Sequence, residues 1–330
     1  MLPLGWRLKF TLYKMRATCK NSMVAIMAHG ANSLKSIFYA LAANSSIAVA
    51  KGFAASITGS SAMLAEAIHS VADCANQLLL LVGLKRAKKP PSVDYPLGYG
   101  KEIYFWSFLV AIFLFSLGGL FSVYEGWHKL HDPQPLKSAW IAICVLVYAV
   151  IAEGLSLMGC IREINKIRPP RQNMWRWFRD TRESDLLVVF GEDIAALCGL
   201  ILALMALLMA IVTGNPLYDA LGSIAIGVLL LIIAVLVGIE VKALLVGQGV
   251  EPHVNKAMLK WLDNRPEVDR VFNMVTLRMG SDVMVAIKAA MIGSEESAGV
   301  MVARINAVEA AFRDEFPNVQ WLFFEPDNKD

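Results

Sequence analysis

Four polar residues recur at about one-turn spacing in an otherwise apolar segment, AEAIHSVADCANQLLLLVGL. Glu66, His69, Asp73 and Gln77 follow one another at intervals of three or four residues. In a helix with 3.6 residues per turn, such side chains share one face. An imidazole and a carboxylate at positions i and i+4 can together bind one divalent cation, either Zn²⁺ or another borderline metal. The alternative is a polar stripe whose groups are satisfied by neighbouring helices.

A second apolar segment, LLVVFGEDIAALCGLILAL, contains two adjacent acids, Glu192 and Asp193. Neighbouring residues of a helix point roughly 100° apart, so we do not expect both acids to serve one site. The alternative is an acid pair that Lys51 neutralises or that is held protonated.

Other polar residues in apolar segments are candidates for the outer contacts of the site or for a proton path. A charged side chain near the bilayer centre costs on the order of 2.5–3.5 kcal/mol, so such residues are functional candidates by default. Lys51 shares a helix face with Asn44 and could pair with a membrane acid, and Glu66 is a further candidate. Glu153 is either a helix partner or a proton-path residue, and Asp219 is most simply a helix-start residue near the interface.

The composition predicts that membrane-spanning helices position these residues. The chain is 56% hydrophobic and 18% charged with a mean hydropathy of +0.52, which is typical of a polytopic membrane protein rather than a soluble domain. The five cysteines form no CxxC pair, so neither a disulfide framework nor a thiolate zinc cluster is expected. A bilayer core of about 30 Å needs roughly 20 apolar residues per helix. Six stretches qualify, at approximately 36–57, 62–84, 103–127, 138–160, 186–212 and 217–245.

Charge in the loops predicts the orientation of these helices. Lys and Arg cluster in the N-terminal segment 1–33 and in the loops LKRAKKPPSVDYPLGYGK and REINKIRPPRQNMWRWFRDTRES. The positive-inside rule then puts both termini and both loops in the cytoplasm. Loops this short beside membrane spans are topology signals, so nucleic acid is not an expected partner. The simple basic loops favour a multi-pass protein of a bacterial inner membrane.

The chain after the last span predicts a separate domain. Residues 248–330 contain an amphipathic helix, two alternating segments around MGSD, a second amphipathic helix and the segment NVQWLFFEP. The order αββαβ indicates a small cytoplasmic, ferredoxin-like α+β domain after the six-helix transport domain 34–247.

Three motifs carry a resemblance to a known family. TGSSAMLAEAIHSVAD, YPLGYGKE and LLVGQGVEP, with the spans and the tail, resemble the cation diffusion facilitator family from about residue 34 onward. AEAIHSVADCANQ with the Glu–Asp pair is most similar to the zinc-transporter-9-like branch and its bacterial relatives. The resemblance implies a homodimer that exchanges a divalent metal, typically zinc, for protons without a prosthetic group.

The resemblance also implies a transport site made by two residues of span two and two of span five. His69 and Asp73 match the span-two pair, and Asp193 matches the second span-five position. The first span-five position is Val189, which cannot bind a metal. The fourth ligand stays open between Glu192, a neighbour such as Glu66 or Asn44, and water. Such a site could take Zn²⁺, Mn²⁺, Fe²⁺ or Co²⁺.

Two other metal positions of the family are weak in this sequence. Tyr99 stands where the glycine-rich loop often has a histidine, which leaves Asp94 alone there. His253 is the single histidine of the tail, so we expect the tail to stabilise a dimer by packing rather than by metal.

The sequence therefore favours a secondary transporter that exports metal in exchange for protons. One alternative is a membrane-embedded hydrolase with a metal-bound water, although the chain has no HExxH motif. The other is a membrane-anchored binding or sensor protein whose αββαβ tail is the working part.

Overall fold

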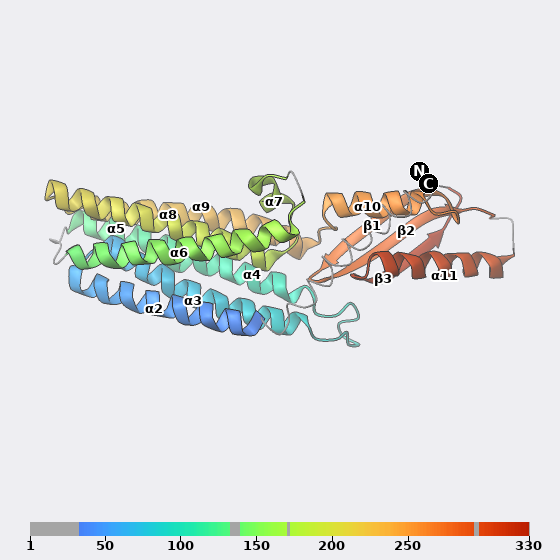
Figure 1. Ribbon diagram of the computed structural model, residues 1–330, viewed down its shortest axis with the longest axis horizontal. Helices are drawn as coiled ribbons and strands as arrows, with labels where there is room; N and C mark the ends of the chain where they lie inside the picture. The colour runs from blue at the N-terminus through green and yellow to red at the C-terminus, as the bar shows by residue number, and fades with distance from the viewer. Residues whose placement is uncertain (1–32, 133–138, 170–171, 294–296, 330) are drawn as a thin grey trace, which may run out of the picture.

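The computed structural model describes residues 33–132, 139–169, 172–293 and 297–329. Apart from Ser33, the basic N-terminal segment expected at 1–33 lies outside these residues. The described chain forms a bundle of long helices and, beyond one end of the bundle, a small α/β domain (Figure 1). We call the end nearer the α/β domain the inner end and the other the outer end.

The helical bundle confirms the predicted membrane-spanning fold. Five of its helices are long and apolar enough to cross a membrane. The sixth, α2, has 26 residues, enough for about 39 Å, and it carries Lys51 and several small polar residues. The long helices are α2 (Ser33–Thr58), α3 (Ser61–Ala87), α4–η2–α5 (Glu102–His131), α6 (Ala139–Ile167), α8 (Ser184–Thr213) and α9 (Leu217–Val246).

The third span differs from the uninterrupted α-helix that its sequence predicts. It consists of α4 (Glu102–Phe113), the π-helical segment η2 (Leu114–Leu120) and α5 (Phe121–His131). Two glycines of η2 let the segment pack closely on α9, since a Cβ atom at Gly119 would lie 2.6 Å from Leu231 Cδ2. A π-helical turn inside a helix often marks a functional site.

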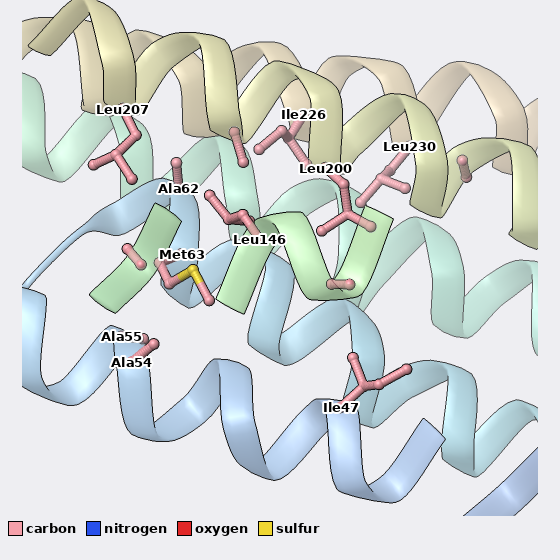
Figure 2. Close-up of a cluster of buried hydrophobic side chains, with 14 of the residues drawn as sticks. Ile47, Ala54, Ala55, Ala62, Met63, Leu146, Leu200, Leu207, Ile226 and Leu230 are labelled. Atoms are coloured by element: carbon pink, nitrogen blue, oxygen red, sulfur yellow. The ribbon is translucent and has the colours of Figure 1, made fainter. Parts of the chain in front are cut away.

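Small side chains set the packing of the bundle. Its core cluster contains buried alanines, such as Ala54 and Ala62, between larger residues such as Leu146, Leu200 and Leu230 (Figure 2). Small residues let helix backbones approach closely, which is the main source of association energy between helices in lipid. This packing places α2, α4, η2, α8 and α9 against α3, and α6 against α2 and α8.

The two turns at the outer end of the bundle each contain a glycine in the left-handed backbone conformation. Gly59 has φ 69° between α2 and α3, and Gly214 has φ 66° between α8 and α9. Asp219 lies in the first turn of α9, as expected, and is buried. Its carboxylate accepts hydrogen bonds from Ser60 Oγ, from Ser61 N at 2.6 Å and from Ser61 Oγ at 2.9 Å. The start of α9 is thereby joined to the start of α3.

The C-terminal domain has the predicted αββαβ order. Its elements are α10 (Pro252–Asp263), β1 (Val268–Met279), β2 (Asp282–Met291), α11 (Ala298–Glu315) and β3 (Val319–Pro326). The strands lie in the order β1-β2-β3, with β1 antiparallel and β3 parallel to β2. Gly280, with φ 68°, makes the β1–β2 turn. Val285, Ile287, Val308 and Phe312 are in the core between sheet and helices.

Both basic loops lie at the inner end of the bundle, beside the α/β domain (Figure 1). The second loop contains a short helix, α7 (Met174–Asp180), which buries Trp177 and Phe178 against the end of the bundle. The loops, α7 and the C-terminal domain are therefore on one side of the membrane.

Candidate metal-transport site

The polar stripe of α3 is buried in the middle of the bundle. Glu66, His69 and Asp73 all face inward, as their spacing predicts. Six of the seven buried side-chain polar atoms that have no hydrogen-bond partner within the described residues belong to residues 66–77. Burying such an atom without a partner costs about 1–3 kcal/mol, and the described parts of the neighbouring helices leave these atoms of the stripe unsatisfied.

His69 and Asp73 form the pair expected from their i, i+4 spacing. His69 Nε2 lies 3.6 Å from Asp73 Oδ2, which is too long for a hydrogen bond. Both ring nitrogens of His69 and Oδ1 of Asp73 are buried and unpartnered among the described residues. On its other side, His69 Nδ1 lies beside η2, 3.8 Å from where a Cβ atom would stand on Gly118. The pair therefore has polar atoms beside the π-helical segment that have no partner among the described residues.

The two acids of α8 diverge, as expected for neighbours on a helix. Glu192 faces α3, and its Oε1 accepts a hydrogen bond of 2.5 Å from Asn76 Nδ2. Asp193 faces α6, and its carboxylate accepts hydrogen bonds of 3.3 and 3.4 Å from Ser156 Oγ. Glu192 is thus the acid of α8 that is directed toward the helix of His69.

The described residues contain no group of three or more His, Cys, Asp or Glu side chains close enough to hold a metal ion. The four residues expected as ligands are brought into one buried region but not into one cluster. His69 and Asp73 are together, while Glu192 and Asp193 are each held by an amide or a hydroxyl group. A metal ion would require the acids of α8 to exchange these neutral partners for the cation.

Lys51 pairs with an acid of α3, not with the acids of α8. Its Nζ atom donates to Glu66 Oε2 at 3.0 Å and to Ser70 Oγ at 2.8 Å, and all three residues are buried. The interpretation of Glu192 and Asp193 as a pair neutralised by Lys51 is therefore wrong. Asn44, the other candidate on this helix, is half-buried.

A family model described as the cation efflux transmembrane domain matches residues 37–246, more than half of the chain. The chain belongs to the cation efflux family. This is the family of cation diffusion facilitators that its motifs resemble, and the match includes every helix that contributes to the buried polar region.

Several named proteins are similar to this cation efflux protein. A human protein named "Proton-coupled zinc antiporter SLC30A9, mitochondrial" is 32% identical over 225 residues, which cover 68% of this chain and 39% of the relative. "Metal tolerance protein C4" of Arabidopsis thaliana is 33% identical over 221 residues, or 66% of this chain and 48% of the relative. "Magnetosome protein MamB" of a Magnetospira strain is 27% identical over 192 residues, or 58% and 59% of the two chains. The chain spans less than half the length of the first two relatives.

Glu153 of this cation efflux protein lies near the other buried acids. It is buried on α6, within electrostatic range of Asp73, Glu192 and Asp193. Ser156, which contacts Asp193, is three residues further along the same face. Glu153 therefore belongs to the same buried acidic region, and its role as a helix partner or a proton-path residue stays a prediction.

Sequence reasoning missed the neutral partners of the stripe. Ser70 and Asn76 lie four residues after Glu66 and three after Asp73, so helical spacing could have identified both. Ser156 belongs to α6 and contacts Asp193. Gly199 belongs to α8, and its lack of a side chain leaves room for Glu66 Oε1. No local pattern in the sequence connects these two residues with α3. Their roles depend on the packing of α6 and α8.

The sequence analysis named two further metal positions of the family, one in the glycine-rich loop and one in the tail. Tyr99 lies against Tyr95, with ring centroids 4.5 Å apart, and Asp94 is exposed. His253 is exposed near the start of α10. Neither position lies near the buried polar region, which leaves that region as the candidate site.

Proposed function

We propose that this protein is a secondary transporter that exports a divalent metal ion, Zn²⁺ first among the candidates, in exchange for protons. One observation carries the proposal: inside a candidate membrane span, the stripe of α3 presents buried histidine and carboxylate atoms that have no hydrogen-bond partner among the described residues. Membership of the cation efflux family supports a transporter rather than a hydrolase. The words "proton-coupled zinc antiporter" in the name of the human relative support both the metal and the exchange.

The proposed site draws on His69, Asp73, Asp193 and Glu192, and the two acids of α8, which face α6 and α3, would have to turn toward the pair on α3 for both to bind one ion. An imidazole with carboxylates suits Zn²⁺, and Mn²⁺, Fe²⁺ and Co²⁺ are the alternatives for the same site. Val189 packs in an apolar cluster, so the fourth ligand must come from elsewhere. The direction of Glu192 toward α3 supports its assignment to that place.

Competition between metal and protons would couple the two fluxes. A metal binds neutral imidazole and ionised carboxylates, so its arrival displaces protons. If the helices expose the site alternately to each side, protons loaded from an acidic outside release the metal there.

The proposed orientation puts the inner end in the cytoplasm. The Lys/Arg-rich loops and the α/β domain lie at that end (Figure 1), in keeping with the positive-inside rule. We propose a bacterial inner membrane, with a mitochondrial membrane as the alternative because the human relative is named as mitochondrial. The other proposed partners are a second copy of the chain and the surrounding lipid. Cell fractionation and size-exclusion chromatography with light scattering test these assignments.

Flux in proteoliposomes that contain a pH-sensitive dye tests the function. Zn²⁺, Mn²⁺, Fe²⁺ and Co²⁺ are added separately to wild type, His69→Ala and Asp73→Asn. We expect metal uptake with opposite proton movement in wild type, and its loss in both variants. Val71→Ala is the matched control because Val71 is exposed on the same helix. A folded wild type that moves none of these metals would refute the proposal.

A further inference from the structure

The Lys51–Glu66 pair is an unusual feature of the bundle. Lysine is almost never fully buried unless it is paired, and a charge inside the membrane is expensive. The Lys51 side chain is nevertheless fully buried, between Glu66 and Ser70 of α3. The pair lies one helical turn from His69, toward the outer end of the bundle.

The carboxylate of Glu66 is held from two sides. Its Oε2 atom accepts the hydrogen bond from Lys51, and its Oε1 atom is buried without a hydrogen-bond partner among the described residues. Oε1 lies against α8, only 2.5 Å from where a Cβ atom would stand on Gly199. Lys51 and the space above Gly199 together fix the direction of this carboxylate.

Without Lys51, Glu66 would be a natural metal ligand. It shares a helix face with His69, and residues three apart on a helix are neighbours. As held, Glu66 does not join His69 and Asp73 in a cluster close enough for a metal ion, as the described residues show. A transport site must bind its ion strongly enough to load and weakly enough to release. A further carboxylate on the metal would oppose release.

We propose that Lys51 is a positioning residue that keeps the carboxylate of Glu66 away from the transported metal. The inference rests on the proposed function of the site. Lys51 supplies a fixed positive charge that occupies Glu66, so the metal meets His69, Asp73 and the acids of α8 alone. The ammonium group thereby limits the affinity of the site and permits turnover.

Three variants of the full chain test the inference: Lys51→Met, Lys51→Met/Glu66→Gln and the control Val71→Ala. Zn²⁺ binding is measured on purified protein, and flux is measured in proteoliposomes. In Lys51→Met we expect the half-saturating Zn²⁺ concentration to fall about tenfold, the low end of what outer contacts of a metal site change, with a slower maximal flux. The double variant should return toward the wild-type value, because glutamine is a poor substitute for a carboxylate ligand.

A spectroscopic measurement separates ligand gain from simple loss of repulsion between Lys51 and the metal. Co²⁺ bound to each variant reports coordination geometry through its visible absorption. We expect Lys51→Met to show the spectrum of a site with an added ligand, and the double variant to show that of wild type. An unchanged Co²⁺ spectrum in Lys51→Met would overturn the inference even if affinity rises.

A more conservative variant decides the question if Lys51→Met does not fold. Ser70→Ala keeps both charges but removes one of the two contacts of Lys51. We expect a smaller fall in the half-saturating Zn²⁺ concentration, and an unchanged value would overturn the inference. Wild type that moves no metal would refute the proposed function, whereas active wild type with unaltered variants refutes this inference alone.

Discussion

Two buried acids of the bundle, Asp219 at its outer end and Asp73 in the middle of α3, have opposite surroundings. The Asp219 carboxylate accepts three hydrogen bonds from Ser60 and Ser61. Asp73 Oδ1 is unpartnered within the described chain, and its Oδ2 faces an imidazole at 3.6 Å. Both side chains are buried. Burial alone therefore does not distinguish the two roles. An acid whose oxygens accept hydrogen bonds from the protein joins helices, whereas an acid with an unpartnered oxygen is available to bind an ion.

The largest effect is expected from Asp73→Asn, which tests the unsatisfied side of the comparison. Transport should fall by more than about 100-fold, because even outer contacts of metal sites change affinity by 10–100-fold. The midpoint of thermal unfolding should stay the same or rise, since a buried carboxyl group without a hydrogen-bond partner among the described residues is replaced. Flux and thermal unfolding of the same preparation check both expectations. A large drop in the unfolding midpoint would give Asp73 a structural role.

Asp219→Ala should have the opposite result. Loss of the carboxylate leaves the N–H of Ser61 and two hydroxyl groups without their acceptor, and we expect a destabilisation of about 2–4 kcal/mol. The half-saturating metal concentration of the folded fraction should be unchanged, because Asp219 contacts the start of α3, about three helical turns before Asp73. Denaturant unfolding combined with flux measures the two quantities. Loss of metal binding without loss of stability would contradict the comparison.

Gly199→Ala tests how tightly Glu66 is held between the helices. The new Cβ atom would lie 2.5 Å from Glu66 Oε1, so α3 and α8 must separate or the carboxylate must move. Overpacking of this kind costs about 1–3 kcal/mol. Gly238→Ala is the matched control, because no atom lies within 4 Å of its new Cβ atom and alanine favours a helix. Equal unfolding midpoints for the two variants would show that the contact is loose.

The smallest effect is expected from Gly118→Ala in the π-helical segment. Its Cβ atom would lie 3.2 Å from Leu230 Cδ1 and 3.8 Å from His69 Nδ1, a tight but tolerable fit. We expect a stability change below about 1 kcal/mol, within the range of mild core substitutions, and a measurable change in metal affinity. Titration of Zn²⁺ into purified protein checks the affinity. An unaltered affinity would show that η2 does not shape the site.

Local periodicity explains why much of the site could be predicted. His69 and Asp73 are four residues apart in one helix, so their proximity follows from helix geometry and needs no tertiary information. The divergence of Glu192 and Asp193 is local for the same reason. By contrast, the π-helical turn at Leu114–Leu120 was missed, because it depends on the contact of its glycines with α9.

The sequence by itself determined the helices, the αββαβ tail and the face of α3 that is polar, because hydrophobic periodicity and turn residues act over a few positions. Tertiary structure alone decided that Lys51 pairs with Glu66, and that Asn76 and Ser156 hold the acids of α8. These contacts join residues on different helices, and many pairings of lysine, amide and acid satisfy the same local pattern. The choice among them is made by side-chain packing, where small residues such as Gly199 leave room for one arrangement.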